Sequence, residues 1–396
     1  MTTVVGGVYL ERCIEPFWND VYGSGGRAAA AISAAVPDVR LATYRAAPLL
    51  DGVTNLESVY GIAVTGPQVP HGVSFDYFHS LATPRIEPRP DAIRVHDPII
   101  VEDDVVLRFG MLEGTARVSA DIAVYDPQSA FDPRPFGENG STAKRLALIL
   151  NRLEARCLTS EVGPEAIVRS LIETQGAEVV VLKMGGYGAL VGTIDACIRV
   201  PAYRSPTVWK IGSGDVYSAA FTQFWGIEAR DPAQAADLAS RATSRYCGTR
   251  MLPIPSSEEL AKLDLDPVVP GRGRIYIAAP FFNLAERWMV EEIRSQLGHM
   301  GVDIFSPLHD VGPGPGEVVA PLDLAGVDDC QAMIAILNGT DPGTVFEVGY
   351  ARARNIPVVA LAQNMRPEDL KMVVGSGCQV VGDLVSAVYH AVWALP

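Results

Sequence analysis

Short apolar runs alternate with amphipathic stretches along the last third of the chain. The apolar runs predict strands, and the stretches with apolar residues three or four positions apart predict helices. Strands are predicted at 274–279, 302–305, 332–337 and 356–361, and helices at 284–298, 317–328 and 343–354. This alternation predicts a flavodoxin-like or Rossmann-like parallel sheet covered on both faces, with ligands bound at the carboxyl ends of the strands.

The first two thirds of the chain also have an α/β pattern, but a less regular one. Strands are predicted at 4–10, 39–44, 120–125 and 177–183, and helices at 26–35, 142–150, 215–226 and 232–247. The stretch 55–112 is rich in proline and aromatic residues and shows no clear period, so we expect a mixed sheet or a lid there. The larger domain is therefore also expected to be an α/β fold.

The segment D-L-D-P-V-V-P-G-R-G-R at 264–274 marks the boundary between these two patterns. Proline and glycine follow an amphipathic helix here and precede a new strand, which is typical of a linker. A chain of 396 residues also exceeds the size at which a single core usually stops growing. We therefore predict two domains, residues 1–263 and residues 274–396.

Charge and cysteine content narrow the partners and the compartment. The chain has 32 Lys and Arg residues against 46 Asp and Glu residues, and it has no block of consecutive basic residues. Long nucleic acid is therefore excluded as a partner, because binding to its phosphates requires a basic surface. Six scattered cysteines without zinc-site spacing indicate buried thiols in a reducing compartment. With no signal-peptide pattern and no membrane-length apolar run, we expect a cytoplasmic protein without a membrane partner.

The most chemically distinctive segment is D-P-G-T-V-F-E-V-G-Y-A-R-A at 341–353, which opens a helix after a strand. Asp341 is expected in the loop and Glu347 in the first turns of the helix, facing the same cleft. Asp323 lies on the preceding predicted helix, and Tyr276 lies in the first strand of the domain. A carboxylate in such a cleft can attack or stabilise an anomeric carbon that has oxocarbenium character.

Three further residues of this domain are candidate substrate contacts. Phe281 and Phe282 follow the first strand, where their rings could stack on a base; the alternative is that they belong to the core. Gly343 lies at the start of the helix, where it is either a substrate contact or a backbone turn residue.

These motifs, in this order, resemble the nucleoside 2-deoxyribosyltransferase family over nearly the whole of 274–396. The resemblance implies that Glu347 is the nucleophile, that Asp341 and Asp323 bind the base and handle its proton, and that Tyr276 orients the nucleophile. It also implies a site without a cofactor and a homo-oligomer, because related transferases complete each pocket with residues from a neighbouring subunit.

The larger domain contains I-G-S-G-D-V-Y-S-A-A-F at 211–221, a glycine-rich turn that leads into a helix. The successive amides of Gly212, Ser213 and Gly214 at a helix N-terminus form an anion site. Asp215 is placed to take a proton from an attacking hydroxyl group.

With N-R-L-E at 151–154, V-V-V-L-K-M-G-G-Y-G-A-L and Y-G-S-G-G-R-A-A-A-A, this turn resembles the ribokinase-like (PfkB) carbohydrate and nucleoside kinase family. The resemblance implies an α/β/α fold for the larger domain. It also implies that Asp215 is the base and that Asn151 and Glu154 help to place Mg²⁺ and the phosphates of ATP. Three departures leave kinase activity open. Trp209-Lys210 replaces the family's Asp-Thr, Ala30 replaces a sugar-contacting Asn, and the segment after the first strand looks too short for the family's lid.

We therefore expect an enzyme that cleaves or transfers at the N-glycosidic bond of a nucleoside or nucleotide, coupled to a kinase-like binding domain. The alternative is a nucleoside 5′-monophosphate N-glycosidase, a hydrolase, in which the larger domain is a non-catalytic ligand sensor. The two reactions share their first half, so the sequence does not separate them. The expected partners are small nucleosides or nucleotides.

Overall fold

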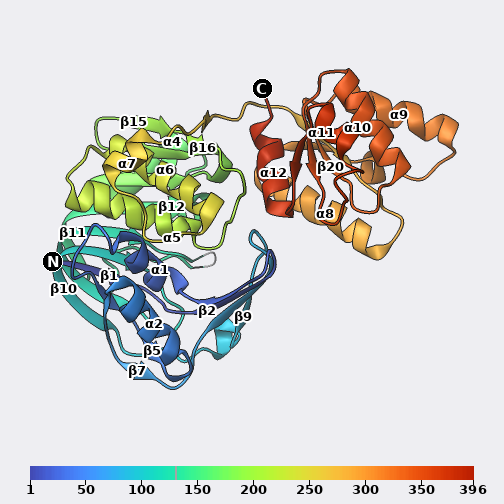
Figure 1. Cartoon of the computed structure of the whole chain (residues 1–396). Helices are drawn as coiled ribbons and strands as arrows, with labels where there is room; N and C mark the ends of the chain where they lie inside the picture. Colours follow the sequence, from blue (N-terminus) through green and yellow to red (C-terminus); the bar gives the residue numbers. More distant parts are fainter. Residues whose placement is uncertain (130–131) are drawn as a thin grey trace. The chain divides into compact units, whose positions relative to one another are not determined.

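The structure, a computed structural model, describes residues 1–129 and 132–396. The chain divides into two compact units, which Figure 1 shows in blue to yellow and in orange to red. The N-terminal unit comprises Met1–Ser205 and Trp209–Pro267, and the C-terminal unit comprises Pro206–Val208 and Val268–Pro396. None of the helices in these described ranges is long and apolar enough to cross a membrane.

The C-terminal unit is built on a five-stranded sheet in which all neighbouring strands are parallel. Across the sheet the order is β19 (Asp303–Phe305), β18 (Arg274–Ala278), β20 (Ala332–Ile336), β21 (Val358–Leu361) and β22 (Gln379–Val381). Counted along the chain this is the order 2-1-3-4-5, which is the flavodoxin-like arrangement. The predicted parallel sheet is confirmed.

Helices cover both faces of this sheet. On one face α8 (Leu284–His299) packs against α12 (Leu384–Trp393). The other pair is α9 (Gly316–Asp328) and α10 (Pro342–Ala353), and α10 contacts β18, β20 and β21. The short α11 (Lys371–Gly375) contacts β22. The sequence interpretation did not extend to α11, β22 and α12.

The N-terminal unit is built on a nine-stranded sheet that is parallel except at β14 and β15. Across the sheet the order is β15 (Cys197–Val200), β14 (Ala189–Gly192), β13 (Val179–Lys183), β12 (Thr142–Asn151), β11 (Ala116–Asp126), β10 (Ile99–Phe109), β1 (Thr2–Val5), β4 (Arg40–Ala42) and β6 (Ala63–Thr65). Further short strands are β5 (Arg45–Ala46), β7 (Gln68–Val69), β16 (Ala202–Tyr203) and β17 (Pro267–Val268).

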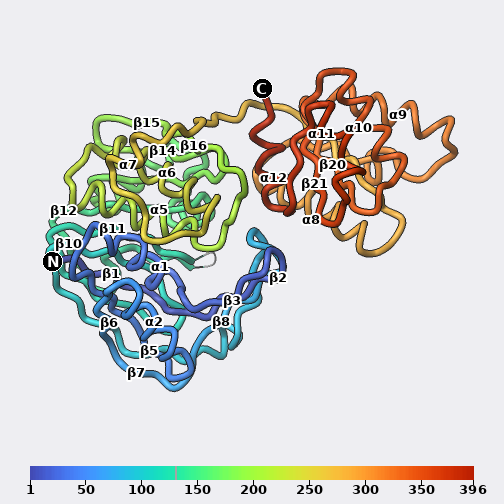
Figure 2. Tube along the Cα trace, viewed as in Figure 1, coloured from blue at the N-terminus to red at the C-terminus, as the bar shows by residue number. Residues whose placement is uncertain are grey.

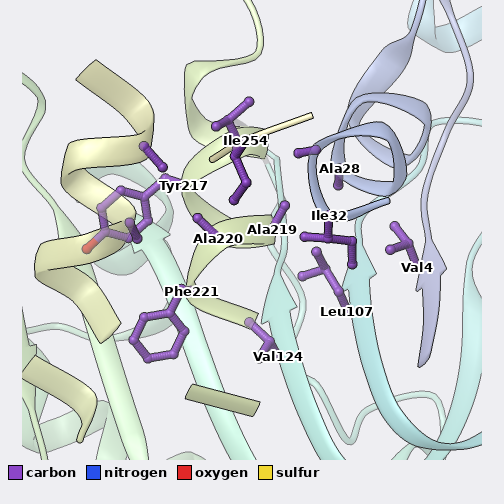
Figure 3. Close-up of a cluster of buried hydrophobic side chains, with 14 of the residues drawn as sticks. Val4, Ala28, Ile32, Leu107, Val124, Tyr217, Ala219, Ala220, Phe221 and Ile254 are labelled. Carbon is purple, nitrogen blue, oxygen red and sulfur yellow. The ribbon is translucent and has the colours of Figure 1, made fainter. Parts of the chain in front are cut away.

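Alternate residues of the central strands point to opposite faces of this sheet, as the two-residue period of a strand requires. Val4 and Leu107 lie in the core beneath α1 and α5, which Figure 3 shows, whereas Val5 and Val106 lie in the core beneath α4. The helices of the unit are α1 (Gly23–Ile32), α2 (Leu50–Tyr60), α3 (Arg152–Leu158), α4 (Pro164–Gln175), α5 (Ser213–Phe221), α6 (Pro232–Thr249) and α7 (Ser257–Lys262), with a π-helical turn, η4 (Thr222–Ile227), after α5. The predicted α/β/α layers are confirmed.

A second, four-stranded sheet belongs to the same unit, and Figure 2 shows β2, β3 and β8 running side by side. Its order is β3 (Trp18–Val21), β2 (Leu10–Glu15), β8 (Ser74–His79) and β9 (Arg85–Glu87). The segment after β1 contributes only β2 and β3 to this sheet, and β8 and β9, which lie far along the chain, complete it.

Two predicted elements of this unit were also wrong. The residues 142–150, predicted to be helical, form β12, whose second half is a buried run between two parallel neighbours. Such a run has no alternation that separates a strand from a helix. The strand predicted at 4–10 ends at Val5, because Gly6 approaches Gly25 of α1 so closely that an added Cβ would lie 2.9 Å from its Cα.

Candidate functional site

The first turn of α10 is fixed by Asp341. Its carboxylate accepts hydrogen bonds from the backbone N–H of Thr344 at 2.7 Å and from the Thr344 hydroxyl at 2.9 Å. Pro342 occupies the first helical position, where its missing N–H costs nothing. Asp341 therefore caps the helix that carries Glu347, and one of its two carboxylate oxygens is committed to that task.

Glu347 meets Tyr276 across the start of α10. The Tyr276 hydroxyl donates a hydrogen bond of 2.8 Å to Oε1 of Glu347. Tyr276 is fully buried on β18, and its ring stacks on Phe305 of β19 with centroids 5.3 Å apart. The sheet thus holds the phenol rigidly, and the phenol holds the carboxylate. The sequence analysis did not identify Phe305, which shows its role only through the pairing of β18 with β19.

The surroundings of Glu347 oppose its negative charge. Burial raises the pKa of Glu347 to about 7, and the charges of Asp323 and Asp341 act in the same direction. The hydrogen bond from Tyr276 acts against these effects and lowers the pKa. Burial and the charge of Glu347 together raise the pKa of Tyr276 far above its usual value, so this phenol stays protonated and remains a donor.

Asp323 lies on α9 and is half-buried. Its Oδ1 atom is buried and has no hydrogen-bond partner within the described ranges. Burial raises the pKa of this carboxyl group. A buried acceptor without a partner is costly, and a ligand that donates a hydrogen bond would remove that cost. The charges of Asp323 and Asp341 both act on Glu347, so these three carboxylates form one cluster.

The aromatic pair, Phe281 and Phe282, follows β18, the strand that carries Tyr276. The rings of Phe281 and Phe282 lie 5.5 Å apart, and Phe282 is 71 % exposed. Phe282 is therefore not a core residue. A Cβ added at Gly343 would lie 3.1 Å from Oδ2 of Asp341, so a side chain there would press on the cap of α10.

In the N-terminal unit, Asp215 on α5 lies in an ion-pair network that the sequence did not reveal. Its Oδ2 accepts a hydrogen bond of 3.0 Å from Arg27, and its Oδ1 accepts one from Gln128. Arg27 is 1 % exposed and also forms a two-hydrogen-bond ion pair with Glu11. An attacking hydroxyl group would have to compete with Arg27 and Gln128 for this carboxylate.

The glycine turn adopts the expected geometry at the start of α5. Gly212 has a φ of 76°, the left-handed region that favours glycine. A Cβ added there would lie 2.1 Å from Nε of Arg27. Lys210 donates a hydrogen bond of 2.8 Å to the hydroxyl of Ser213, and the Nζ of Lys183 lies 3.6 Å from the place of a Cβ on Gly214.

Asn151 and Glu154 form a capping box at the start of α3. Asn151 Oδ1 accepts from the backbone N–H of Leu153 and of Glu154, and Glu154 Oε2 accepts from the backbone N–H of Asn151. Burial and the charge of Asp126 raise the pKa of Glu154 to about 7. Lys183 pairs with Asp126 at 2.6 Å.

These contacts fit Mg²⁺ poorly. The capping box already uses oxygens of Asn151 and Glu154, and the ammonium of Lys183 already balances the buried carboxylate of Asp126. No group of three or more potential metal ligands occurs within residues 1–129 and 132–396.

Two of the residues that depart from the kinase pattern, Trp209 and Ala30, are packed in the core. Trp209 is 2 % exposed, packs against Trp18, and has the guanidinium of Arg250 4.0 Å above its ring. Ala30 is fully buried within α1. Trp209 and Ala30 therefore serve packing in this chain.

Comparisons with known proteins distinguish the two units. Residues 275–380 match the family model described as nucleoside 2-deoxyribosyltransferase. The comparison with curated proteins gives no match.

Among solved structures, the chain is similar to a ribokinase from Thermotoga maritima, with 18% identity and a TM-score of 0.47 over 66% of this chain and 98% of that one. It is also similar to a nucleoside kinase from Burkholderia thailandensis in complex with inosine, with 14% identity and a TM-score of 0.48 over 67% and 98%. A PfkB protein from Polaromonas sp. JS666 gives 16% identity and a TM-score of 0.47 over 66% and 98%. For the C-terminal unit, the match to the family model confirms the resemblance to the nucleoside 2-deoxyribosyltransferase family over residues 275–380.

Proposed function

We propose that the C-terminal unit cleaves the N-glycosidic bond of a nucleoside or nucleotide, with Glu347 as the nucleophile. The observation that carries this proposal is the hydrogen bond from the buried Tyr276 to Glu347. This bond orients the carboxylate of Glu347, which belongs to a cluster of three carboxylates, and leaves its second oxygen free to react. The match of residues 275–380 to a family named for deoxyribosyl transfer supports the same chemistry.

In the first half-reaction, a carboxylate oxygen of Glu347 forms a bond to the anomeric carbon as the bond from that carbon to the base nitrogen breaks. The base leaves with the electron pair of the broken bond and takes up a proton. Asp323, whose pKa is raised by burial, is suited to supply or share that proton. Phe281 and Phe282 would stack on the base.

The second half-reaction decides between transfer and hydrolysis. Attack by a second base on the glycosyl-enzyme completes a transfer, whereas attack by water completes a hydrolysis. Glu347 is half-buried, so water reaches its side chain in a single chain. This exposure favours hydrolysis, and hence an N-glycosidase, as the second candidate, whereas transfer requires a further surface that covers the site.

For the N-terminal unit we propose ligand binding without efficient phosphoryl transfer. Asp215 would have to act as a base, but both its oxygens already accept hydrogen bonds. Robust phosphate transfer to a sugar or nucleoside that disappears in Asp215→Asn would overturn this assignment.

The test of the glycosidic chemistry is release of free base from a panel of nucleosides, deoxynucleosides and their monophosphates, with and without a second base. Glu347→Gln should lower the rate at least about 10³-fold, because a neutral amide cannot replace the nucleophile. Glu368→Gln, at a surface residue paired with Lys371, is the matched control and should leave the rate unchanged. If Glu347→Gln retains more than a few per cent of the activity, the assignment of the nucleophile is wrong.

A further inference from the structure

The four-stranded sheet of the N-terminal unit is tied to the start of α5 at both of its ends. Within this sheet β2 and β8 are parallel, and Glu11 lies near the starts of both strands. Ser80 follows directly after the end of β8. Each end of the sheet contacts either α5 or the segment that leads into it.

At the first end, Arg27 of α1 joins Glu11 of β2 to Asp215 of α5. Arg27 forms two hydrogen bonds with the carboxylate of Glu11 and one of 3.0 Å with the carboxylate of Asp215. All three side chains are buried. Nη1 of Arg27 bonds to both carboxylates at 3.0 Å, so the two bonded oxygens lie at most about 6 Å apart. The two carboxylates thus share one guanidinium, and the trio keeps a net negative charge.

The glycine turn leaves room for this arginine. A Cβ added at Gly212 would lie 2.1 Å from Nε and 2.2 Å from Cδ of Arg27. Any side chain at this position would therefore push Arg27 out from between the two carboxylates. The guanidinium also lies over the ring of Tyr22, with 5.1 Å between its central carbon and the ring centroid. The sequence of the turn is thus compatible with Arg27 in this place and with little else.

At the other end, the sheet contacts the two residues that precede the glycine turn. The rings of Trp18 on β3 and Trp209 lie 5.5 Å apart, and the guanidinium of Arg250 lies 4.0 Å from the Trp209 ring and 5.9 Å from the Trp18 ring. The hydroxyl of Ser80 accepts a hydrogen bond of 3.2 Å from the backbone N–H of Lys210. The segment that leads into α5 is therefore held by β3 and by the end of β8.

We propose that these contacts form an autoinhibitory latch with Arg27 at its centre, which keeps the four-stranded sheet against the start of α5 until the ion pairs of Arg27 break. Without Arg27, the buried carboxylates of Glu11 and Asp215 would face each other without a counter-charge, and their repulsion would drive β2 and α5 apart. Opening of the sheet therefore controls access to Asp215. This regulation goes beyond the ligand binding proposed for the unit.

The thiol of Cys13 on β2 reports whether the sheet has opened. Cys13 is 3 % exposed and belongs to the same core as Trp209 and Tyr246. Burial raises the pKa of its thiol to about 11, so alkylation is slow unless the sheet moves away. Two other cysteines calibrate the measurement. Cys157 is exposed, and Cys247 on α6 is 7 % exposed and should stay covered when the sheet alone opens.

The test is the rate of alkylation of each cysteine by iodoacetamide in the full-length protein, followed by mass spectrometry. Arg27→Met should raise the rate at Cys13 at least about tenfold, because it leaves two buried carboxylates without a counter-charge. The rates at the other two cysteines should not change. Arg12→Gln is the matched control, since it removes an arginine of the same strand whose ion pair is exposed, and it should change the rate at Cys13 less than twofold.

Two further variants keep the test decisive if Arg27→Met fails to fold. Glu11→Gln keeps the size of the side chain but weakens the latch, so it should raise the rate at Cys13 severalfold. In the double variant Glu11→Gln/Arg27→Met the repulsion is gone, so the rate should fall below that of Arg27→Met alone. An unchanged rate at Cys13 in Glu11→Gln overturns the proposal. An equal rise at Cys13 and Cys247 in that variant also overturns it, because the ion pairs would then support the whole unit and not the position of the sheet.

Discussion

Glu347 must be ionised to act as a nucleophile, and its surroundings hold its pKa at about 7. The active fraction of the enzyme should therefore rise as the pH rises through about 7. Tyr276→Phe removes the one hydrogen bond that lowers this pKa, so the midpoint should move to higher pH. The variant should lose more activity near pH 6 than near pH 9. The measurement is kcat/KM for base release as a function of pH.

The matched control for that profile is Tyr203→Phe in the N-terminal unit, which removes a comparable tyrosine–carboxylate bond to Asp237. Its profile should coincide with that of the unmodified protein. A profile for the unmodified protein that is flat from about pH 5 to pH 9 would contradict the role of Glu347.

The same pKa shift predicts an effect on stability. The pKa of Glu347 is raised from 4.5, so between about pH 4.5 and pH 7 the folded state binds more protons than the unfolded state. The stabilising contribution of the protonated form is complete at low pH and is lost as the pH rises through about 7. Glu347→Gln should therefore be more stable than the unmodified protein at pH 8, on the order of 1–2 kcal/mol after allowance for partial exposure.

Urea denaturation at pH 8 and at pH 5 measures this effect as the free energy of unfolding of the C-terminal unit. The gain in the free energy of unfolding should shrink at the lower pH. A Gln variant that is less stable at pH 8 would show that the carboxylate is favoured, not opposed, by its surroundings.

At the scale of the element, Asp341 has two roles that substitution can separate. Asp341→Asn keeps an oxygen that can cap α10, so the stability should change little while the charge beside Glu347 is lost. Asp341→Ala removes the cap and should cost about 1 kcal/mol. Chemical denaturation compares the two variants, and base release shows whether the charge matters. Equal stability of the two would mean that the bonds to Thr344 do not stabilise the helix.

Local signals account for the elements that the sequence predicted well. For α10, the run Asp341-Pro342 places a cap and a first-turn proline directly after a buried strand, and both signals act within a few residues. The strand β12 lacked any such signal, because an apolar strand between two parallel neighbours resembles a helix core. The pairing of β2 with β8 was not predicted, because the two strands lie far apart in the sequence.

In the candidate site, too, the sequence predicted residues that belong to local motifs but did not predict long-range contacts. Tyr276, Asp323 and Glu347 could be singled out because family motifs carry them, although only the paired strands show that Phe305 stacks on Tyr276. The contact between Arg27 and Asp215 spans 188 positions and has no local pattern. Long-range ion pairs of this kind arise from the sheet topology, and sequence alone did not predict them.

At the scale of the whole molecule, the helices that carry Asp323 and Glu347 also expose apolar side chains. Val318 and Leu322 on α9 are 52 % and 51 % exposed, and Phe346 on α10 is 63 % exposed. Phe346 is adjacent in sequence to Glu347, and Leu322 is adjacent to Asp323. We propose that a second copy of the chain covers this surface in a homo-oligomer, which would also shield the site from water.

This proposal predicts that light scattering gives a mass at least twice the 42.4 kDa of one chain. Phe346→Asp should shift the protein toward the monomer, because a charge in an apolar interface loses its hydration. Met372→Asp, at an 82 % exposed residue of α11, is the matched control and should leave the mass unchanged. In the Phe346 variant, the ratio of hydrolysis to transfer should rise as water gains access to the glycosyl-enzyme. A monomeric unmodified protein with full activity would remove the proposal, since a single chain would then complete its own site.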